Sequence, residues 1–162
     1  MNSVAAAFPS DARVPFERGA LHEQRKDYAA AEAAFRDALA KDPNHAPTLN
    51  YLGYMLAERG ERLDEAVSLV RRALDLDPGN SSYLDSLGWA YVRQKRYGDA
   101  EPLLRKAAAA LPSNSVVQDH LGDLLWATGR RHDAVAAWRR ALDGDRDDLD
   151  VSLVEKKIQR AQ

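Results

Sequence analysis

The chain repeats itself with a period of 34 to 35 residues, and this period restricts its fold more than any other feature. Intervals of 34, 35 and 34 residues separate one set of glycines, Gly19, Gly53, Gly88 and Gly122. The same intervals separate one set of prolines, Pro9, Pro43, Pro78 and Pro112. Because two residue types agree in register, we infer a tandem array of similar units.

Each unit is predicted to contain two helices. In residues 46–59, Leu49, Leu52 and Leu56 recur at i, i+3 and i+7, which places them on one helical face. Residues 63–76 follow a similar pattern. The segments "KDPNH", "LDPGN" and "LPSNS" end one unit, and their Asn or Ser is expected to cap the next helix.

Small residues at fixed positions indicate where the two helices of a unit cross. Glycine at the eighth position and alanine at the twentieth leave no bulk, so the two backbones can approach closely. A hairpin this short cannot cover its own apolar faces, and stacking on neighbouring hairpins stabilises the array. The sequence therefore predicts an all-α solenoid.

The pattern resembles the tetratricopeptide repeat. In the third unit the residues that carry this resemblance are Leu87, Gly88, Tyr91, Tyr97, Ala100, Leu104, Ala107 and Pro112. The resemblance implies a right-handed α-solenoid of four helical hairpins plus a C-terminal capping helix. The chain departs from the family pattern at Pro15 and Arg18 in the first unit and at Arg146 in the fourth.

The period gives the boundaries of the predicted units. They are 12–45, 46–80 with one inserted residue, 81–114 and 115–148, followed by the capping helix 149–162. Residues 1–11 contain "AAAFPS", which is similar to "AAALPS" at 108–113, and are interpreted as the remnant of a preceding repeat. The sequence as a whole resembles the C-terminal array of larger bacterial tetratricopeptide proteins.

Composition excludes several classes of function. The 162 residues include 23 basic and 25 acidic side chains and no cysteine, so neither a general nucleic-acid binder nor a disulfide or Cys-zinc protein is expected. No apolar run reaches the roughly 18 residues of a membrane span. The scattered histidines form no catalytic pattern, and we predict no enzyme. Localisation, cytoplasmic or periplasmic, stays open, with any targeting signal expected upstream.

No metal or cofactor is predicted. Residues 143–154 are acidic like a calcium loop, but Asp148 stands where glycine is needed and Val154 where a bidentate glutamate belongs. An acidic linker at the start of the capping helix is the favoured interpretation. Asp119, His120 and Asp123 could share a helical face, although without a strong metal-binding spacing.

Basic residues recur on the second helices, and their role has two interpretations. Arg36, Arg71-Arg72, Arg105-Lys106 and Arg139-Arg140 could form a ladder that binds a polyanion. The favoured alternative is a solvated face, in which Glu32 pairs with Arg36 and Glu101 with Arg105 at i, i+4. The turns inside units are also basic and the connections between units acidic, which predicts a basic and an acidic edge.

The resemblance implies that the first helices line a concave groove. Its predicted contact residues are Asn50, Tyr51, Tyr54, Glu58, Asp85, Ser86, Trp89, Arg93, Asp119, His120, Asp123 and Trp126. About half of the aromatic ones are expected to pack between repeats instead. The carboxylate clamp of some relatives is absent, since its positions hold Phe16, Ala20, Tyr51, Ser82 and Ser86.

These residues predict a non-enzymatic protein–protein interaction module, an adaptor or scaffold. The expected ligand is a peptide or protein segment with basic and apolar residues, because the groove residues combine rings with carboxylates. The alternatives are a self-assembling scaffold, with self-association through residues 1–25, and, ranked last, a polyanion binder that uses the arginine ladder.

Overall fold

The structure is a computed structural model that describes residues 11–162, and all regular structure in this range is α-helical. The helices of its first part are α2 (Arg13–Gln24), α3 (Tyr28–Lys41), α4 (Ala46–Arg59) and α5 (Leu63–Leu76). Those that follow are α6 (Ser81–Arg93), α7 (Tyr97–Ala110), α8 (Ser115–Ala127), α9 (Arg131–Asp143) and α10 (Val151–Ala161).

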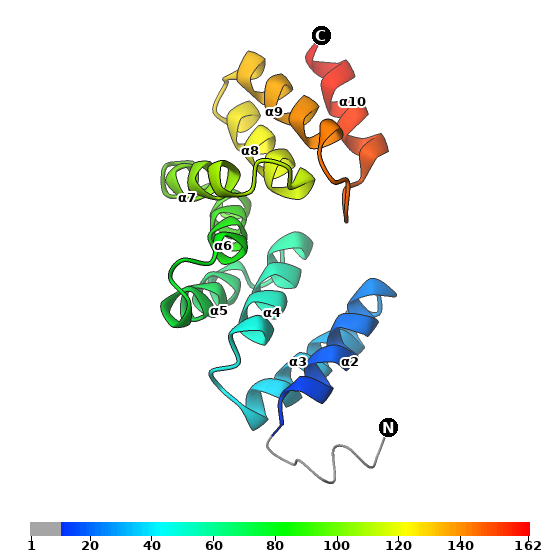
Figure 1. Cartoon of the computed structure of the whole chain (residues 1–162), viewed down its shortest axis with the longest axis vertical. Coiled ribbons are helices and arrows are strands. Elements are labelled where there is room, and N and C mark those ends of the chain that lie inside the picture. The colour runs from blue at the N-terminus through cyan, green and yellow to red at the C-terminus, as the bar shows by residue number, and fades with distance from the viewer. Residues whose placement is uncertain (1–10) are drawn as a thin grey trace. The chain divides into compact units, whose positions relative to one another are not determined.

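The chain divides into two compact units, unit 1 (Met1–Gly79) and unit 2 (Asn80–Gln162). In unit 1, α2 packs against α3, α4 packs against α5, and α3 contacts α4. In unit 2, α6 packs against α7 and α8 against α9, while α7 and α6 both contact α8 (Figure 1). Helix α10 packs against α9. Each unit thus contains two helical hairpins, and unit 2 has one further helix.

The fixed glycines lie where the two helices of a hairpin touch. A Cβ atom added at Gly53 would lie 2.6 Å from Cγ2 of Val70, and one added at Gly19 would lie 2.6 Å from Cδ1 of Phe35. In unit 2, Gly88 faces Leu104 and Gly122 faces Trp138 in the same way. These separations are shorter than any ordinary carbon contact, so the predicted close approach is confirmed.

The capping prediction is confirmed for two helices and wrong for one. The Asn80 side chain accepts from Tyr83 N at 3.1 Å, and that of Asn114 accepts from Val117 N at 3.0 Å. Asn44 does not cap α4, because the helix begins one residue later and its N-cap, His45, makes no capping hydrogen bond. An asparagine caps only when it directly precedes the first helical residue.

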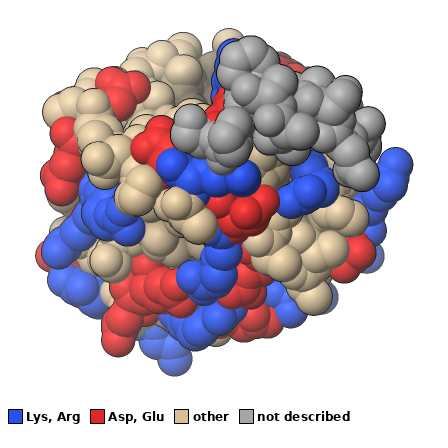
Figure 2. All heavy atoms as spheres, turned by 90° about the horizontal axis from the view of Figure 1, so that it is seen from below, with Lys and Arg blue, Asp and Glu red and all other residues tan. Residues whose placement is uncertain are grey.

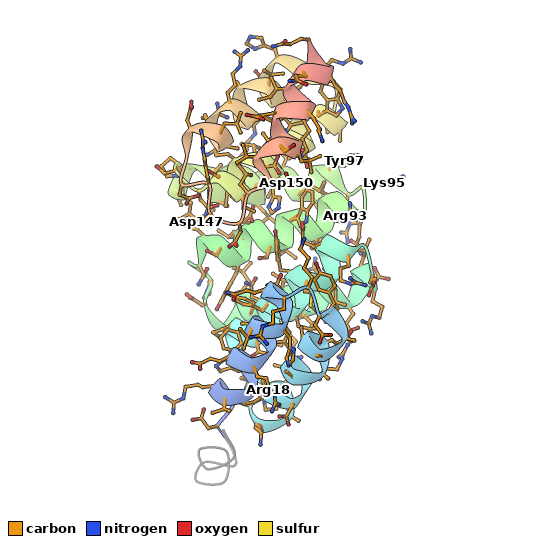
Figure 3. The ribbon with its side chains drawn as sticks, turned by 90° about the vertical axis from the view of Figure 1, so that its right-hand side faces the viewer. Arg18, Arg93, Lys95, Tyr97, Asp147 and Asp150 are labelled. Atoms are coloured by element: carbon orange, nitrogen blue, oxygen red, sulfur yellow. The ribbon has the colours of Figure 1, made fainter. Side chains whose placement is uncertain are left out.

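The acidic segment before the terminal helix has the role that the sequence predicted. Asp150 is the N-cap of α10, and its carboxylate accepts from Leu153 N at 3.0 Å. The carboxylate of Asp145 accepts from the backbone N–H of Ser115, at the start of α8, at 3.2 Å. In Figure 3, Asp147 of this segment and Lys95 of the α6–α7 turn lie on opposite sides of unit 2.

The hypothesis about residues 1–11 falls outside the described residues except for Asp11. Helix α2 carries two large apolar side chains within the range predicted to self-associate, and one of them, Leu21, is 40% exposed. Phe16 is half-buried, and its ring lies 5.2 Å from that of Tyr51 and 6.2 Å from that of Phe35. Phe16 therefore packs within its own unit.

Candidate functional site

On α4 of unit 1, Tyr51 and Glu58 reach solvent and Tyr54 is half-buried. Tyr51 is 43% exposed, and its ring meets Phe16 edge to face. Asn50 is 9% exposed, and its Oδ1 atom has no hydrogen-bond partner among the described residues. A ligand on this helix would therefore meet two tyrosine rings and one carboxylate.

In unit 2, Asp85 of α6 and His120 of α8 form a buried pair. Nδ1 of His120 lies 3.0 and 2.9 Å from the two carboxylate oxygens of Asp85, and the side chains are 4% and 7% exposed for His120 and Asp85. The Trp89 indole stacks on the imidazole with the ring centroids 4.2 Å apart and the planes at 10°. These three predicted contact residues therefore hold the two hairpins of unit 2 together.

The remaining predicted residues of α6 differ in exposure. Ser86 is buried, and its hydroxyl donates to the carbonyl oxygen of Ser82 at 3.0 Å. Arg93 is exposed at the end of the helix, where Figure 3 shows it near Lys95 of the following turn and Tyr97, the first residue of α7. Its guanidinium lies 5.9 Å from the centre of the Trp89 ring, within cation–π range.

The carboxylates of α8 bind a lysine of the chain's own terminal helix. Nζ of Lys157 in α10 lies 2.9 Å from Oδ1 of Asp119 and 2.8 Å from Oδ1 of Asp123. Nε1 of Trp138 also donates to Oδ1 of Asp123 at 3.0 Å. On the same helix Trp126 is half-buried, with its ring centre 5.7 Å from that of Trp138. The sequence analysis did not predict Lys157 as a neighbour of the candidate site residues Asp119 and Asp123.

Charge is not balanced in this cluster. Burial, reinforced by the neighbouring Asp123 carboxylate, raises the pKa of Asp119 above its ordinary value. Burial opposes the charge of Lys157, but the carboxylates of Asp123 and Asp119 outweigh it and raise the pKa of that ammonium. One ammonium faces two carboxylates, and the raised pKa of Asp119 reflects this excess of carboxylates.

On the second helices, the predicted i, i+4 pairs are confirmed. Arg36 binds Glu32 at 2.7 Å, and Arg105 binds Glu101 at 2.8 Å. Each glutamate also accepts from an arginine of the next hairpin, Arg62 for Glu32 at 2.7 Å and Arg130 for Glu101 at 2.6 Å. On the face drawn in Figure 2, basic and acidic side chains are intermingled. This pairing removes two arginines from the proposed polyanion ladder.

Replacing Glu101 by glutamine should lower the free energy of unfolding of unit 2 by about 1 kcal/mol at neutral pH, discounted for partial exposure. Hydrogen bonds from Arg130 and Arg105 lower the pKa of Glu101 to about 2. Since the folded pKa lies below the ordinary value of 4.5, the stabilisation is present above that pH and is lost as the pH falls toward 2.

Urea titrations at pH 7 and at about pH 2.5, followed by tryptophan fluorescence, measure this difference. The difference between the two proteins should shrink at the lower pH. The control is Glu155→Gln, an exposed glutamate of α10 that makes no ion pair within the described residues. A loss for Glu101→Gln that is equal at both values would contradict the charge-based explanation.

The acidic side chains of the candidate site in unit 2 pair with basic side chains of the same chain. Within residues 11–162, no group of three or more His, Asp or Glu side chains is arranged to hold a metal ion. Asp119 and Asp123 face Lys157, whereas His120 faces Asp85. In this same part of the chain, no helix has both the length and the apolar character needed to cross a bilayer.

The sequence matches the family model of the tetratricopeptide repeat over residues 1–46, 28–81 and 53–115. The three overlapping matches together run from residue 1 to 115 of 162, which is more than half of the chain. The chain belongs to the tetratricopeptide repeat family. Tetratricopeptide repeat proteins are generally interaction modules and not enzymes, and this membership supports a general role in protein–protein interaction.

Curated relatives are much longer than this tetratricopeptide repeat chain. The TPR repeat-containing protein PA4667 of Pseudomonas aeruginosa is 42% identical over 116 residues, which cover 72% of this chain and 20% of that protein. The anaphase-promoting complex subunit 6 of Arabidopsis thaliana is 31% identical over 115 residues, which cover 71% and 21%. The chain therefore spans about a fifth of the length of these two relatives.

Solved structures confirm the predicted all-α helical-repeat solenoid. The type IV pilus biogenesis factor PilW superposes with a TM-score of 0.80 at 23% identity, covering 99% of this chain and 74% of that one. A point mutant of the protein MamA gives a TM-score of 0.68 at 27% identity, covering 93% and 83%. The first of these likenesses concerns the fold alone.

Proposed function

We propose that this chain is an adaptor or scaffold that binds a lysine-containing amphipathic segment of a partner protein along the first helices of its hairpins. In unit 1 the contact surface is formed by Tyr51, Tyr54 and Glu58. In unit 2 it is formed by Arg93, Trp126 and the acidic pair of α8, which consists of Asp119 and Asp123. Four other residues of unit 2 that were predicted to contact the ligand are buried and support these surfaces from below. They are Asp85, Ser86, Trp89 and His120.

The contact between α10 and α8 carries this proposal. Val154 and Ile158 of α10 are 1% and 9% exposed, and Lys157 extends from the same face to the acidic pair. A helix with two buried aliphatic residues and one lysine is the kind of ligand that the sequence predicted. Helix α10 thus occupies the acidic pair as an internal counterpart of the ligand, and a partner segment competes with it.

The proposal predicts that weakening α10 opens the acidic pair to a peptide in trans. A fluorescent peptide with the sequence of α10, VSLVEKKIQRA, is titrated against the full chain and followed by anisotropy. Lys157→Ala in the chain should raise the affinity about tenfold, because the tethered lysine competes at a high effective concentration. Asp119→Asn together with Asp123→Asn, added to that variant, should abolish the gain.

The matched control is the neighbouring exposed lysine of α10, Lys156→Ala, which should leave the affinity unchanged. A second control is the same peptide with glutamine in place of the lysine that corresponds to Lys157. Equal peptide affinities for the Lys157→Ala and Lys156→Ala variants would contradict the proposal. An affinity that does not change when both aspartates are replaced would also contradict it. Circular dichroism checks that each variant keeps its helix content.

Two alternative functions, self-association and polyanion binding, remain predictions, as do the unit boundaries. Self-association through residues 1–25 is supported by the 40% exposure of Leu21 in α2. Polyanion binding along the arginine ladder is not favoured, because Arg36 and Arg105 are neutralised by glutamates of their own helices. The activity and partners of any longer protein that includes this array are likewise a matter of proposal.

A further inference from the structure

The outer face of α9 has a hollow that the proposed function does not use. Helix α10 lies beside α9 at the C-terminal end of unit 2 (Figure 1). The hollow measures about 540 Å³ and is lined by Arg131, His132, Val135, Ala136, Arg139 and Ala161. Arg131, Val135 and Arg139 are four residues apart, so they follow one face of the helix. An apolar floor therefore lies between two guanidinium groups.

Comparison of the hairpins shows that Arg139 lacks the glutamate that two of its three counterparts have. Arg36 and Arg105 occupy the same position in their own hairpins, and each binds a glutamate one turn earlier. In α9 the residue one turn earlier is Val135. Within residues 11–162 no carboxylate pairs with Arg139, and its side chain is exposed. Helices α5 and α9 thus have a valine, Val67 and Val135, where α3 and α7 have a glutamate.

Arg131 adds a second cation without a carboxylate. It stands where the equivalent helices α3 and α7 begin with Tyr28 and Tyr97. Its guanidinium lies 5.2 Å from the centre of the Trp126 ring, and no carboxylate of the described chain pairs with it. Nδ1 of His132, at the rim, lies 3.8 Å from Oδ1 of its neighbour Asp133. The rim of the hollow is therefore positively charged.

We propose that this surface, formed by α9 and the end of α10, docks an acidic amphipathic helix of a partner protein. Arg131 and Arg139 are eight residues apart, or about 12 Å along the helix axis, so two carboxylates two turns apart on the partner can pair with both. Apolar side chains of the partner then cover Val135, Ala136 and Ala161. The partner supplies the carboxylate that Glu32 and Glu101 supply inside two of the other hairpins.

The apolar floor distinguishes this partner from a polyanion. A nucleic acid or sulfated polysaccharide gains its affinity from cations and leaves aliphatic side chains without a complementary surface. An amphipathic helix satisfies both parts of the hollow, because its apolar stripe lies between two rows of charged residues. The surface is separate from the acidic pair of α8, which attracts ligands of the opposite charge.

The test uses the full chain and a designed amphipathic peptide of about 15 residues, with leucines on one face and glutamates along both flanks. Anisotropy measures its affinity. Arg139→Glu and Arg131→Glu should each weaken binding about tenfold or more, and a peptide with glutamine at every glutamate should bind at least tenfold more weakly. Lys106→Glu, the same charge change at an exposed residue of α7, should change the affinity less than twofold.

Three results would overturn the proposal. If Lys106→Glu weakened peptide binding as much as Arg139→Glu does, the effect would come from the overall charge of the chain and not from this surface. Displacement of the peptide by heparin with the same dependence on Arg139 would assign the surface to polyanions. Self-association of the chain without peptide, abolished by Arg139→Glu, would assign it to a second copy. The basic peptide VSLVEKKIQRA should not displace the acidic one, so failure here is distinguishable from failure of the proposed function.

Discussion

Replacing Asp85 by alanine should lower the free energy of unfolding of unit 2 by about 3 kcal/mol. The variant removes the acceptor of the His120 Nδ1–H group, which stays buried against the Trp89 ring. A buried donor without a partner costs much more than the pair contributes when complete. All three tryptophans, Trp89, Trp126 and Trp138, lie in unit 2, so their fluorescence in a urea titration follows the unfolding of that unit.

Two further variants separate this explanation from simple loss of volume. Asp85→Leu combined with His120→Leu should cost less than Asp85→Ala alone, because neither member of the pair is left buried without the other. Asp143→Ala removes an exposed carboxylate at the end of α9 and should change stability by less than about 0.5 kcal/mol. A loss below about 1 kcal/mol for Asp85→Ala would show that water or another group satisfies the imidazole.

The hairpins of this protein could be predicted from the sequence because their cause is local. Glycine recurs wherever a second helix brings Phe35, Val70, Leu104 or Trp138 against the first helix. A contact of this kind depends only on residues about 16 positions apart in one hairpin. The period, the helix pairs and the crossing points therefore follow from the order of residues in a single repeat.

The solvent exposure of the candidate site residues could not be predicted from the repeat pattern. Periodicity places Tyr51 and Ser86 at the same position of successive repeats, yet Tyr51 is 43% exposed and Ser86 is 4% exposed. Burial depends on side chains that arrive from the next hairpin. Asp119 is the residue that occupies the position of Asp85 in the next repeat. The side chain that Asp85 contacts is instead that of His120, one residue after Asp119 and 35 residues after Asp85. Only the three-dimensional structure shows which neighbour fills the space.

The sequence indicates that Lys157 needs a carboxylate partner but does not identify that partner. Val154 and Ile158 lie on the buried face of α10, and Lys157 falls three residues after the first and one before the second. A lysine at the edge of a buried stripe needs a carboxylate nearby to hold its charge there. Asp119 and Asp123 were the available carboxylates on α8, but nothing in the sequence fixes which face of α8 the terminal helix covers.

Gly122→Ala should also lower the free energy of unfolding of unit 2, by about 3 kcal/mol. The added methyl group would overlap Cδ1 and Nε1 of Trp138, which is 2% exposed and cannot move aside without disturbing its neighbours. Displacing the indole also strains the hydrogen bond from its Nε1 to Asp123. These costs exceed the roughly 1 kcal/mol that alanine gains over glycine as a helix former.

Gly98→Ala provides the matched control, because it is the same substitution in a helix of the same unit. Gly98 lies in the first turn of α7, and a Cβ atom added there has no atom within 4 Å. Only the gain in helix propensity is left, so this variant should be more stable by about 0.5 kcal/mol. Opposite signs for the two substitutions in urea titrations would locate the cost at the crossing of α8 and α9. A neutral Gly122→Ala would mean that α9 can slide away from α8 and that the repeated glycine is not required by their contact.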